Sequence, residues 1–447
     1  MSSAPPTSPL RRWLPVAAVL AAAGFVWLMA TIGRRLAEGG TVLHLLGGYV
    51  LRGGWDVVLT PRVLLPAAVA LAGVLWGPAL AARVRFGALL AGSAVASGGW
   101  AVALALSSGW HRLPEPLAVR YEYPHDVPRV GSIGEFLSTF TASVPADSAD
   151  PWTTHVAGHP PGALLSFVLL DRLGLDGLGW DAALCIVGGA LAVPAVLLTV
   201  RAVADEARAR VVAPFLVLAP IALWVATSAD SLFAGVAAWG VAGLATAATA
   251  GPGWRRDVRA LVGGLLLGLA LFLSFGLTAL GLVALVVVLV HRCELGWGGV
   301  VRVLGVGTAG VVLVVVAYAV GGYWWLDGFH AAGDRVRSGP SYANRPLGFF
   351  LFANLAAAAL ALGPAAIAGL ASLRRHRLAL LPLAALVGIL ASDATGLVRG
   401  ETERIWLPFY VWVLTATAFL PARRRRLWLA LGAVLAIGIE VTVRTEW

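Results

Sequence analysis

The sequence contains no lysine, only two cysteines and two methionines, and few charged residues for its length. Charged residues make up 13% of the 447 positions and hydrophobic residues 59%, whereas soluble domains carry about 25% charged residues. This composition excludes a soluble globular protein and a disordered chain, and the cysteine count excludes a disulfide scaffold. Cys185 and Cys293 lie in or beside apolar stretches, so we interpret both as unpaired packing residues.

Long apolar runs dominate the remainder of the sequence. Its mean hydropathy is +0.84, and a membrane-spanning helix needs about 20 apolar residues. We therefore predict an all-α polytopic membrane protein with about 12–14 transmembrane helices. The predicted spans lie near residues 13–31, 63–82, 86–107, 180–200, 210–227, 231–250, 260–275, 277–291, 299–321, 347–371, 378–393, 405–421 and 427–443.

The net charge of +10 is carried entirely by arginine. Such a charge suggests nucleic acid as the partner of a soluble protein, but these arginines form short clusters beside apolar segments, as cytoplasmic anchors do. We predict contact with membrane lipids and none with nucleic acid. The clusters lie at Arg11–Arg12, Arg83–Arg85, Arg201–Arg210, Arg255–Arg259, Arg292–Arg302, Arg374–Arg377 and Arg423–Arg426.

Placing every cluster in the cytoplasm gives an alternating topology with outer loops near residues 322–346 and 394–404. The same rule places loop 108–160 outside, whereas loop 32–60 fits least well because it carries three arginines. The predicted organisation is therefore N-terminal transmembrane helices at 1–107, an extracytoplasmic catalytic loop at 108–162 and a transmembrane bundle at 163–447. The arginine, alanine and glycine bias suggests a GC-rich bacterial genome, and hence a bacterial plasma membrane.

Loop 108–160 is longer than a connection between two membrane helices needs, which is typical of a functional loop. It contains Glu122 and Asp126 in the segment YEYPHD, and His155 and His159 before two prolines. Residues 131–140 are expected to form a short amphipathic helix whose apolar face, made of Ile133, Phe136, Leu137 and Phe140, lies at the membrane surface. Residues 162–175 are expected to form a short or tilted helix that enters the membrane.

The segment Gly158–Gly162 (GHPPG) is suited to the start of a helix, because proline is favoured at the first helical position. A helix N-terminus attracts anions, so His159 lies beside a potential phosphate or carboxylate site. The simpler alternative is a proline-initiated helix with a surface histidine.

Three ordered motifs resemble the GT-C superfamily of membrane glycosyltransferases. They are an acidic outer loop followed by His-Pro-Pro, the turn 226–232 (ATSADSL), and the segment 403–409 (ERIWLPF). The resemblance is strongest to the protein O-mannosyltransferase and aminoarabinose transferase type and to bacterial relatives that use polyprenyl-phosphate sugars. It covers residues 108–425. The sequence departs from this family in having two extra spans before the loop, and in spacing Glu122 and Asp126 four residues apart where the family has adjacent acidic residues.

The resemblance implies transfer of a sugar from a polyprenyl-phosphate donor to a glycan, lipid or protein acceptor on the outer face. Such a transfer needs a carboxylate to accept the proton of the acceptor hydroxyl, and Asp126 and Glu122 are the candidates. Either carboxylate could instead be a solvated loop charge. The sequence leaves open which of the two is the base.

The expected substrate-binding residues are His159, His155, Arg404, Asp230 and Arg345. Arg404 lies at the outer end of a span, against the cytoplasmic trend of arginine, and a lipid phosphate would explain its position. The alternative is an ion pair with Glu401 or Glu403. For Asp230, which opens an apolar helix, the alternative is an N-cap. Arg345 adds phosphate-binding capacity after the aromatic segment 323–327.

No cofactor is expected. A divalent metal ion bound by His155 and His159 is the alternative, but these two histidines, with His111 and His125, show no recognisable metal-ligand spacing. Two other function classes remain open. A membrane transporter or lipid flippase would place ionisable residues near the bilayer midplane, whereas the distinctive carboxylates here gather in an outer loop. A non-catalytic assembly subunit is the third alternative.

Overall fold

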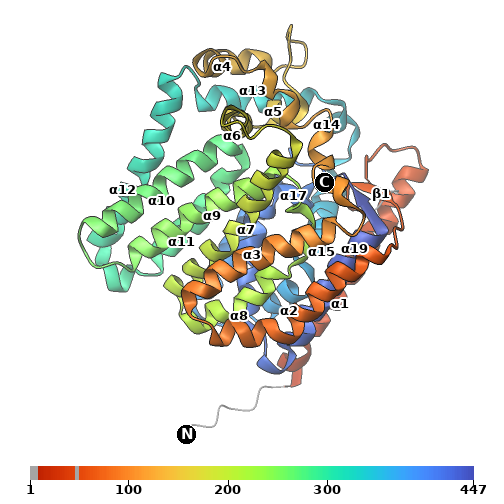
Figure 1. Cartoon of the computed structure of the whole chain (residues 1–447), viewed down its shortest axis with the longest axis vertical. Helices are drawn as coiled ribbons and strands as arrows, with labels where there is room; N and C mark the ends of the chain where they lie inside the picture. Colours follow the sequence, from red (N-terminus) through yellow and green to blue (C-terminus); the bar gives the residue numbers. More distant parts are fainter. Residues whose placement is uncertain (1–8, 46–49, 447) are drawn as a thin grey trace.

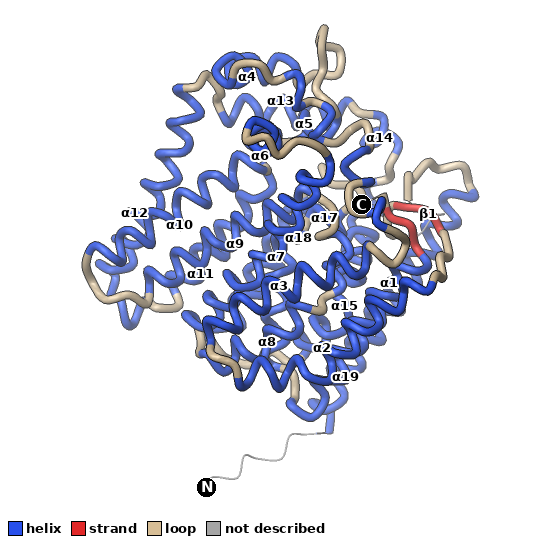
Figure 2. Tube along the Cα trace, viewed as in Figure 1, coloured by secondary structure: helices blue, strands red, loops and turns tan. Residues whose placement is uncertain are grey.

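The computed structural model describes residues 9–45 and 50–446 and is built almost entirely of helices. In this part of the chain, eight helices are long and apolar enough to cross a membrane. They are α1 (Pro9–Glu38), α2 (Leu64–Arg83), α3 (Phe86–Ala105), α7 (Leu178–Val203), α9 (Ala229–Ala248), α12 (Arg292–Val320), α15 (Leu347–Ala371) and α16 (Leu380–Ala394). The prediction of an all-α polytopic membrane protein is thus confirmed (Figures 1 and 2).

Eight spans are fewer than the 12–14 expected, and the difference has a physical cause. The other predicted spans are helices too short or too charged to cross a membrane by length and composition alone. For example, α19 has 18 residues and includes Arg425, Arg426 and Glu440. The others are α8 (Glu206–Val217), α10 (Trp254–Leu273), α11 (Gly281–Leu289) and α18 (Leu407–Val413), with α19 at Arg425–Thr442.

The remaining elements are short and lie mainly at one end of the bundle, where α4, α5, α13 and α14 are grouped (Figure 1). They are α4 (Ile133–Thr139), α5 (Thr154–Gly158), α6 (Pro161–Arg172), α13 (Trp325–Ser338), α14 (Pro340–Asn344) and α17 (Thr402–Ile405). Two strands, β1 (Gly53–Trp55) and β2 (Val443–Thr445), pair antiparallel and join the segment after α1 to the segment after α19. We call this end, which carries loop 108–160, the loop end.

Arginine clusters that are far apart in the sequence contact one another away from the loop end. Arg210 donates to the main-chain carbonyl groups of Ala81 and Val84 at the turn between α2 and α3. Arg377 pairs with Glu294 at a distance of 3.0 Å. These contacts connect four of the clusters that the charge pattern assigns to one side of the membrane.

Small residues allow the central helices to pack closely, as is common between membrane helices. A Cβ atom at Gly264 of α10 would lie 1.9 Å from the carbonyl oxygen of Gly307 in α12. Likewise, a Cβ at Gly235 of α9 would lie 2.2 Å from the carbonyl oxygen of Gly188 in α7. Any larger residue at these positions would separate the helices that hold the loop end in place.

Loop 108–160 is folded onto the bundle. The expected amphipathic helix is present as α4, and the side chain of Ser132 caps its N-terminus by accepting the N–H of Glu135. Its apolar face does not lie free for lipid, which corrects the expectation. Phe140 instead packs against Trp152 and Tyr323, with ring centroids 5.6 Å apart in both cases.

Both cysteines are free. Cys185 is buried in α7, as expected of a packing residue, whereas Cys293 is exposed at the start of α12. The packing interpretation is therefore wrong for Cys293, which stands next to Arg292 in one of the charged clusters.

Candidate functional site

A buried network of charged residues lies at the loop end, with Arg404 at its centre. The guanidinium of Arg404 is 2.7 Å from the carboxylate of Asp230 and 2.6 Å from that of Glu401. The same group lies 3.1 Å from Nε2 of His155. Arg404 and Asp230 are 5% and 3% exposed, so this is a buried ion pair and its charges depend on one another.

The network continues from His155 to Glu122. Nδ1 of His155 is 2.8 Å from Oε1 of Glu122, whose side chain is buried. Burial alone would raise the pKa of Glu122, but the interaction with His155, including its hydrogen bond, and the positive charge of Arg404 outweigh it and hold the pKa below its ordinary value. Glu122 is therefore a carboxylate at neutral pH, although it is enclosed by protein.

Local structure explains how each side chain reaches the network. Asp230 lies in the first turn of α9, and Arg404 in the single turn of α17. Glu401 precedes that turn with φ of 62°, a left-handed conformation that is uncommon for a residue other than glycine. Such outliers gather at functional sites. Glu401 adopts this left-handed conformation while its carboxylate pairs with two arginines.

The second arginine is Arg52, which follows the end of α1 in the sequence. It pairs with Glu401 and, at 2.8 Å, with Glu446. Sequence reasoning did not assign Arg52 a role, yet the signal was present. Arg52 breaks the cytoplasmic trend of arginine in the same way as Arg404. The side chains of Arg52 and Glu401 are 20% and 13% exposed, so solvent reaches the network from this side.

His159 lies beside the network among aromatic rings. Its Nδ1 is 2.8 Å from the main-chain carbonyl oxygen of His155. Its ring lies 5.8 Å from that of Tyr123 and 5.7 Å from that of Phe233. Burial lowers the pKa of His159 to about 4, so the imidazole is neutral at physiological pH.

Asp126 lies in a different set of contacts from Glu122. Its Oδ1 accepts a hydrogen bond from Arg129 at 2.6 Å, and its Oδ2 accepts the main-chain N–H of Thr153 at 2.9 Å. Arg129 in turn lies over the ring of Trp152, 4.1 Å from its centroid. Oδ2 of Asp126 thus joins the two halves of loop 108–160 directly, and Oδ1 joins them through Arg129, which donates to the main-chain carbonyls of Asp150 and Pro151.

Arg345 is near the network and differs from Arg404 in its surroundings. It is 7% exposed, donates to the main-chain carbonyl of Arg399, and lies 5.6 Å from the ring centroid of Phe350. Within residues 9–45 and 50–446, no carboxylate forms an ion pair with Arg345. Burial is the main cause that lowers the pKa of its guanidinium, and the negative field of Glu401 acts against this shift.

Glu403 is fully buried next to Arg404, and its Oε1 accepts the main-chain N–H of Arg52 at 3.1 Å. Burial raises its pKa to about 7, even though hydrogen bonds from main-chain N–H groups act in the opposite direction. Of the two partners expected for Arg404 in the ion-pair alternative, Glu401 forms the pair. Glu403 instead accepts a hydrogen bond from the main chain at Arg52.

The structure thus brings together Glu122, His155, Asp230 and Arg404 from four separate segments, with His159 and Arg345 close by and Asp126 in other contacts. Among the described residues, no group of three or more His, Cys, Asp or Glu side chains could hold a metal ion. The arrangement combines a buried carboxylate, a histidine bridge and arginines at one end of a membrane bundle.

Comparison with known proteins gives few matches. No protein-family model and no curated protein matches the sequence. Two solved structures, both of the oligosaccharyltransferase of Archaeoglobus fulgidus, are similar to the chain. The structure in complex with zinc and sulfate is 15% identical, covers 80% of this chain and 53% of that chain, and has a TM-score of 0.43. The apo form is 13% identical, covers 81% and 57%, and has a TM-score of 0.45. The chain spans about half the length of these oligosaccharyltransferase chains.

Proposed function

We propose that the protein is a membrane glycosyltransferase of GT-C type that takes a sugar from a polyprenyl-phosphate donor. The observation that carries the proposal is the convergence of three motifs. The acidic loop with its histidines, the Ser-Ala-Asp turn and the Glu-Arg-Ile-Trp-Leu-Pro segment supply Glu122, His155, Asp230 and Arg404 to one network. A shared site requires such a meeting of the three motifs.

Glu122 is the better candidate for the base. In the transfer, the acceptor oxygen forms a bond to the anomeric carbon, the bond from that carbon to the phosphate oxygen breaks, and the hydroxyl proton moves to a carboxylate. Glu122 is ionised at neutral pH and linked through His155 to Arg404. Both oxygens of Asp126 are already occupied by hydrogen bonds within the loop.

Arg345 is the better candidate for holding the donor phosphate. The departing phosphate carries charge that a fixed guanidinium stabilises. Asp230 and Glu401 already neutralise much of the charge of Arg404, whereas Arg345 has no such partner among the described residues. Arg404 then acts as a positioning residue that holds Asp230, Glu401 and His155, which differs from the phosphate contact expected from the sequence.

The acceptor is a hydroxyl of a cell-envelope glycan, lipid or protein, and the reaction takes place on the outer face of a bacterial plasma membrane. Support for this side comes from the arginine clusters, which lie away from the loop end and are expected in the cytoplasm. Membrane lipids are the expected surroundings of the bundle, because eight helices are long and apolar enough to span a membrane.

The test uses the full chain reconstituted in vesicles with a panel of radiolabelled polyprenyl-phosphate sugars and an extract of envelope acceptors. We expect release of polyprenyl phosphate with transfer of label for one donor, and its loss in Glu122→Gln. Glu135→Gln is the matched control because Glu135 is an exposed carboxylate of the same loop. Movement of an intact donor across the vesicle membrane, without release of polyprenyl phosphate, would identify a flippase and contradict the proposal.

A further inference from the structure

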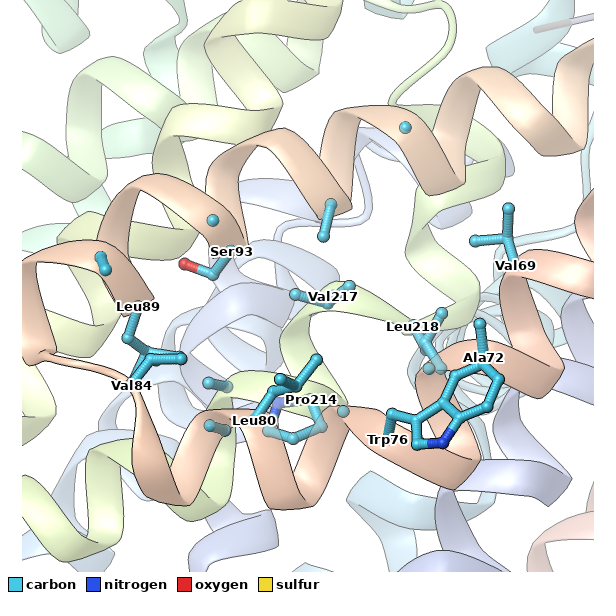
Figure 3. Close-up of a pocket in the computed structure, with 18 residues that line it drawn as sticks. Val69, Ala72, Trp76, Leu80, Val84, Leu89, Ser93, Pro214, Val217 and Leu218 are labelled. Atoms are coloured by element: carbon cyan, nitrogen blue, oxygen red, sulfur yellow. The ribbon is translucent and has the colours of Figure 1, made fainter.

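An apolar groove of about 520 Å³ runs between α2, α3 and α8, which places it in the size range of small-molecule sites. Figure 3 shows Trp76, Leu80 and Val84 on one side, Ser93 on the other, and Val217 and Leu218 between them. Both α2 and α3 are candidate membrane spans, so the groove lies at the level of the hydrocarbon. Trp76 and Leu80 are 60% and 58% exposed, and the groove is therefore open to the lipid side of the bundle.

The lining is almost entirely apolar, and the indole N–H of Trp76 and the hydroxyl of Ser93 are its polar side-chain groups. Ser93 supplies the only hydroxyl among the lining residues, and its Oγ already donates to the main-chain carbonyl of Leu90 at 2.9 Å. The groove runs along α2 from Val69 to Val84, which is about 22 Å at 1.5 Å per residue. One leaflet is about 15 Å thick, so the groove can hold a lipid chain over the full depth of a leaflet.

Two glycines of α3 line the groove, and no close contact within the protein requires a glycine at either position. A Cβ atom at Gly92 or Gly99 of α3 would meet no atom within 4 Å. Glycine weakens a helix relative to alanine, and close helix contacts explain some glycines of this bundle, such as Gly264, but not others, such as Gly87. At Gly92 and Gly99, the absence of a side chain leaves the groove open.

Positive charge stands at one end of the groove. Val84 is the last lining residue of the turn between α2 and α3, and Arg83 and Arg85 flank it and are exposed. In the part of the chain that the structure describes, neither guanidinium has an ion pair or side-chain hydrogen bond. Arg210, which contacts the same turn, is by contrast paired with Glu206 at 2.7 Å.

We propose that this groove is a binding site for an anionic phospholipid of the leaflet on the arginine side. One acyl chain lies in the groove between α2 and α3, and the phosphate of the headgroup lies between Arg83 and Arg85. An apolar channel that ends in unpaired cations matches a molecule with a hydrocarbon chain and an anionic head. The site lies between α2, α3 and α8 and shares no residue with the network around Arg404.

Quenching of Trp76 fluorescence by brominated lipid tests the proposal on the full chain in vesicles. The contribution of Trp76 is the difference between wild type and Trp76→Phe. Vesicles of phosphatidylcholine contain a small fraction of either acyl-brominated phosphatidylglycerol or acyl-brominated phosphatidylcholine. We expect phosphatidylglycerol to quench Trp76 at a lower mole fraction, by about 5-fold for each arginine involved.

The variants separate the headgroup from the chain. Arg83→Gln with Arg85→Gln removes the preference for the anionic lipid, while Gly92→Leu fills the groove and removes quenching by both lipids. Gly87→Leu is the matched control, because Gly87 is also exposed on α3 with free space but does not line the groove. Trp27, which is 70% exposed on α1, serves as a lipid-facing tryptophan for which no preference is expected.

Two results would overturn the proposal. Equal quenching of Trp76 by both lipids in wild type would mean that the groove holds bulk lipid without selection. Absence of quenching by either lipid would mean that another protein surface, such as a second copy of the chain, covers the groove.

Discussion

The carboxylate of Asp230 accepts a 2.7 Å hydrogen bond from Arg404, although the two residues are 174 positions apart in the sequence. Both side chains are buried, and each belongs to a segment that opens an apolar helix. The pair therefore joins the start of α9 to α17 just before α18, and fixes the relative position of two parts of the bundle at the loop end.

Removing one partner of this pair should destabilise the protein strongly. Asp230→Asn leaves the guanidinium of Arg404 buried with one carboxylate fewer, and breaking a buried ion pair typically costs about 3–5 kcal/mol. We expect a clearly lower midpoint of thermal unfolding in detergent. The double variant Asp230→Asn with Arg404→Gln should recover part of this loss, because Glu401 keeps Arg52 as a partner. Additive losses in the double variant would show that the two residues are not coupled.

Glu122→Gln and Asp126→Asn should have different consequences. Glu122→Gln removes the proton acceptor, and we expect transfer to fall by about 10²–10⁴-fold with insertion unchanged. Asp126→Asn weakens the contacts with Arg129 and Thr153, so it should loosen loop 108–160. Faster hydrogen exchange of the Thr153 amide would report that loosening. Loss of transfer in Asp126→Asn with an intact loop would instead return the role of base to Asp126.

Replacing Arg345 should weaken use of the donor more than it weakens the fold. A charge-assisted hydrogen bond contributes about 1.5–3 kcal/mol, so Arg345→Gln should raise KM for the lipid-linked donor by about 10- to 100-fold. Arg345→Lys should retain part of the binding, since an ammonium offers only a point charge. Arg337→Gln is the control, because Arg337 is 51% exposed and paired with Asp334. An unchanged KM in Arg345→Gln would exclude Arg345 from donor binding.

Part of this site could be predicted from the sequence. Glu122, His155, Asp230 and Arg404 follow from motif order and from an arginine on the unexpected side of the membrane. The partners of Arg404 could not be predicted, because a pairing between distant segments leaves no local pattern. Asp126 shows the same limit. It stands four residues from Glu122, yet the 3-10 turn Tyr123–His125 separates the two and directs them into different contacts.

Hydropathy is sufficient to predict some helices of this protein and not others. The long apolar run near residues 231–250 predicts α9 directly. The stretch near 210–227 was expected as one span, but α8 ends at Val217 and a 3-10 segment, Pro220–Trp224, follows. Pro220 has no N–H to continue the helical hydrogen bonds. Apolar composition alone cannot reveal such a break.

His159 and Glu403 should give opposite pH dependences of stability. The pKa of His159 falls from 6.5 to about 4 on folding through burial, so between these values the unfolded chain binds an extra proton and stability falls as the pH is lowered. The pKa of Glu403 rises from 4.5 to about 7, also through burial, so the folded chain holds the extra proton and stability rises as the pH is lowered from 7 to 4.5.

The two contributions partly cancel in the wild type, and single variants should separate them. Thermal unfolding between pH 7.5 and 5 is the measurement. Glu403→Gln should make the midpoint fall on acidification, and His159→Asn should make it rise or stay level. The same slope in both variants would contradict the assigned protonation states.

The two ends of α12 can report on which side of the membrane each end of the bundle lies. Cys293 is exposed at the start of this helix, next to Arg292. Ser138 lies at its other end, since a Cβ atom at Gly322 would be 2.8 Å from the Cβ of Ser138. The helix is broken at Gly296, and the continuous part after the break, residues 297–320, is about 36 Å long at 1.5 Å per residue. This length is enough to place the two positions on opposite sides of a bilayer.

We expect a membrane-impermeant thiol reagent to label Ser138→Cys in intact cells when Cys293 is replaced by serine. Wild-type Cys293 should be labelled only after the membrane is permeabilised, because the arginine cluster beside it anchors that end in the cytoplasm. Cys185 is buried and should stay unlabelled in both cases, so it needs no replacement. The reverse pattern would place loop 108–160 in the cytoplasm, and a donor and acceptor would then have to be sought on that side. Labelling of both positions in intact cells would mean that α12 does not span the membrane, which would remove the basis for assigning either side.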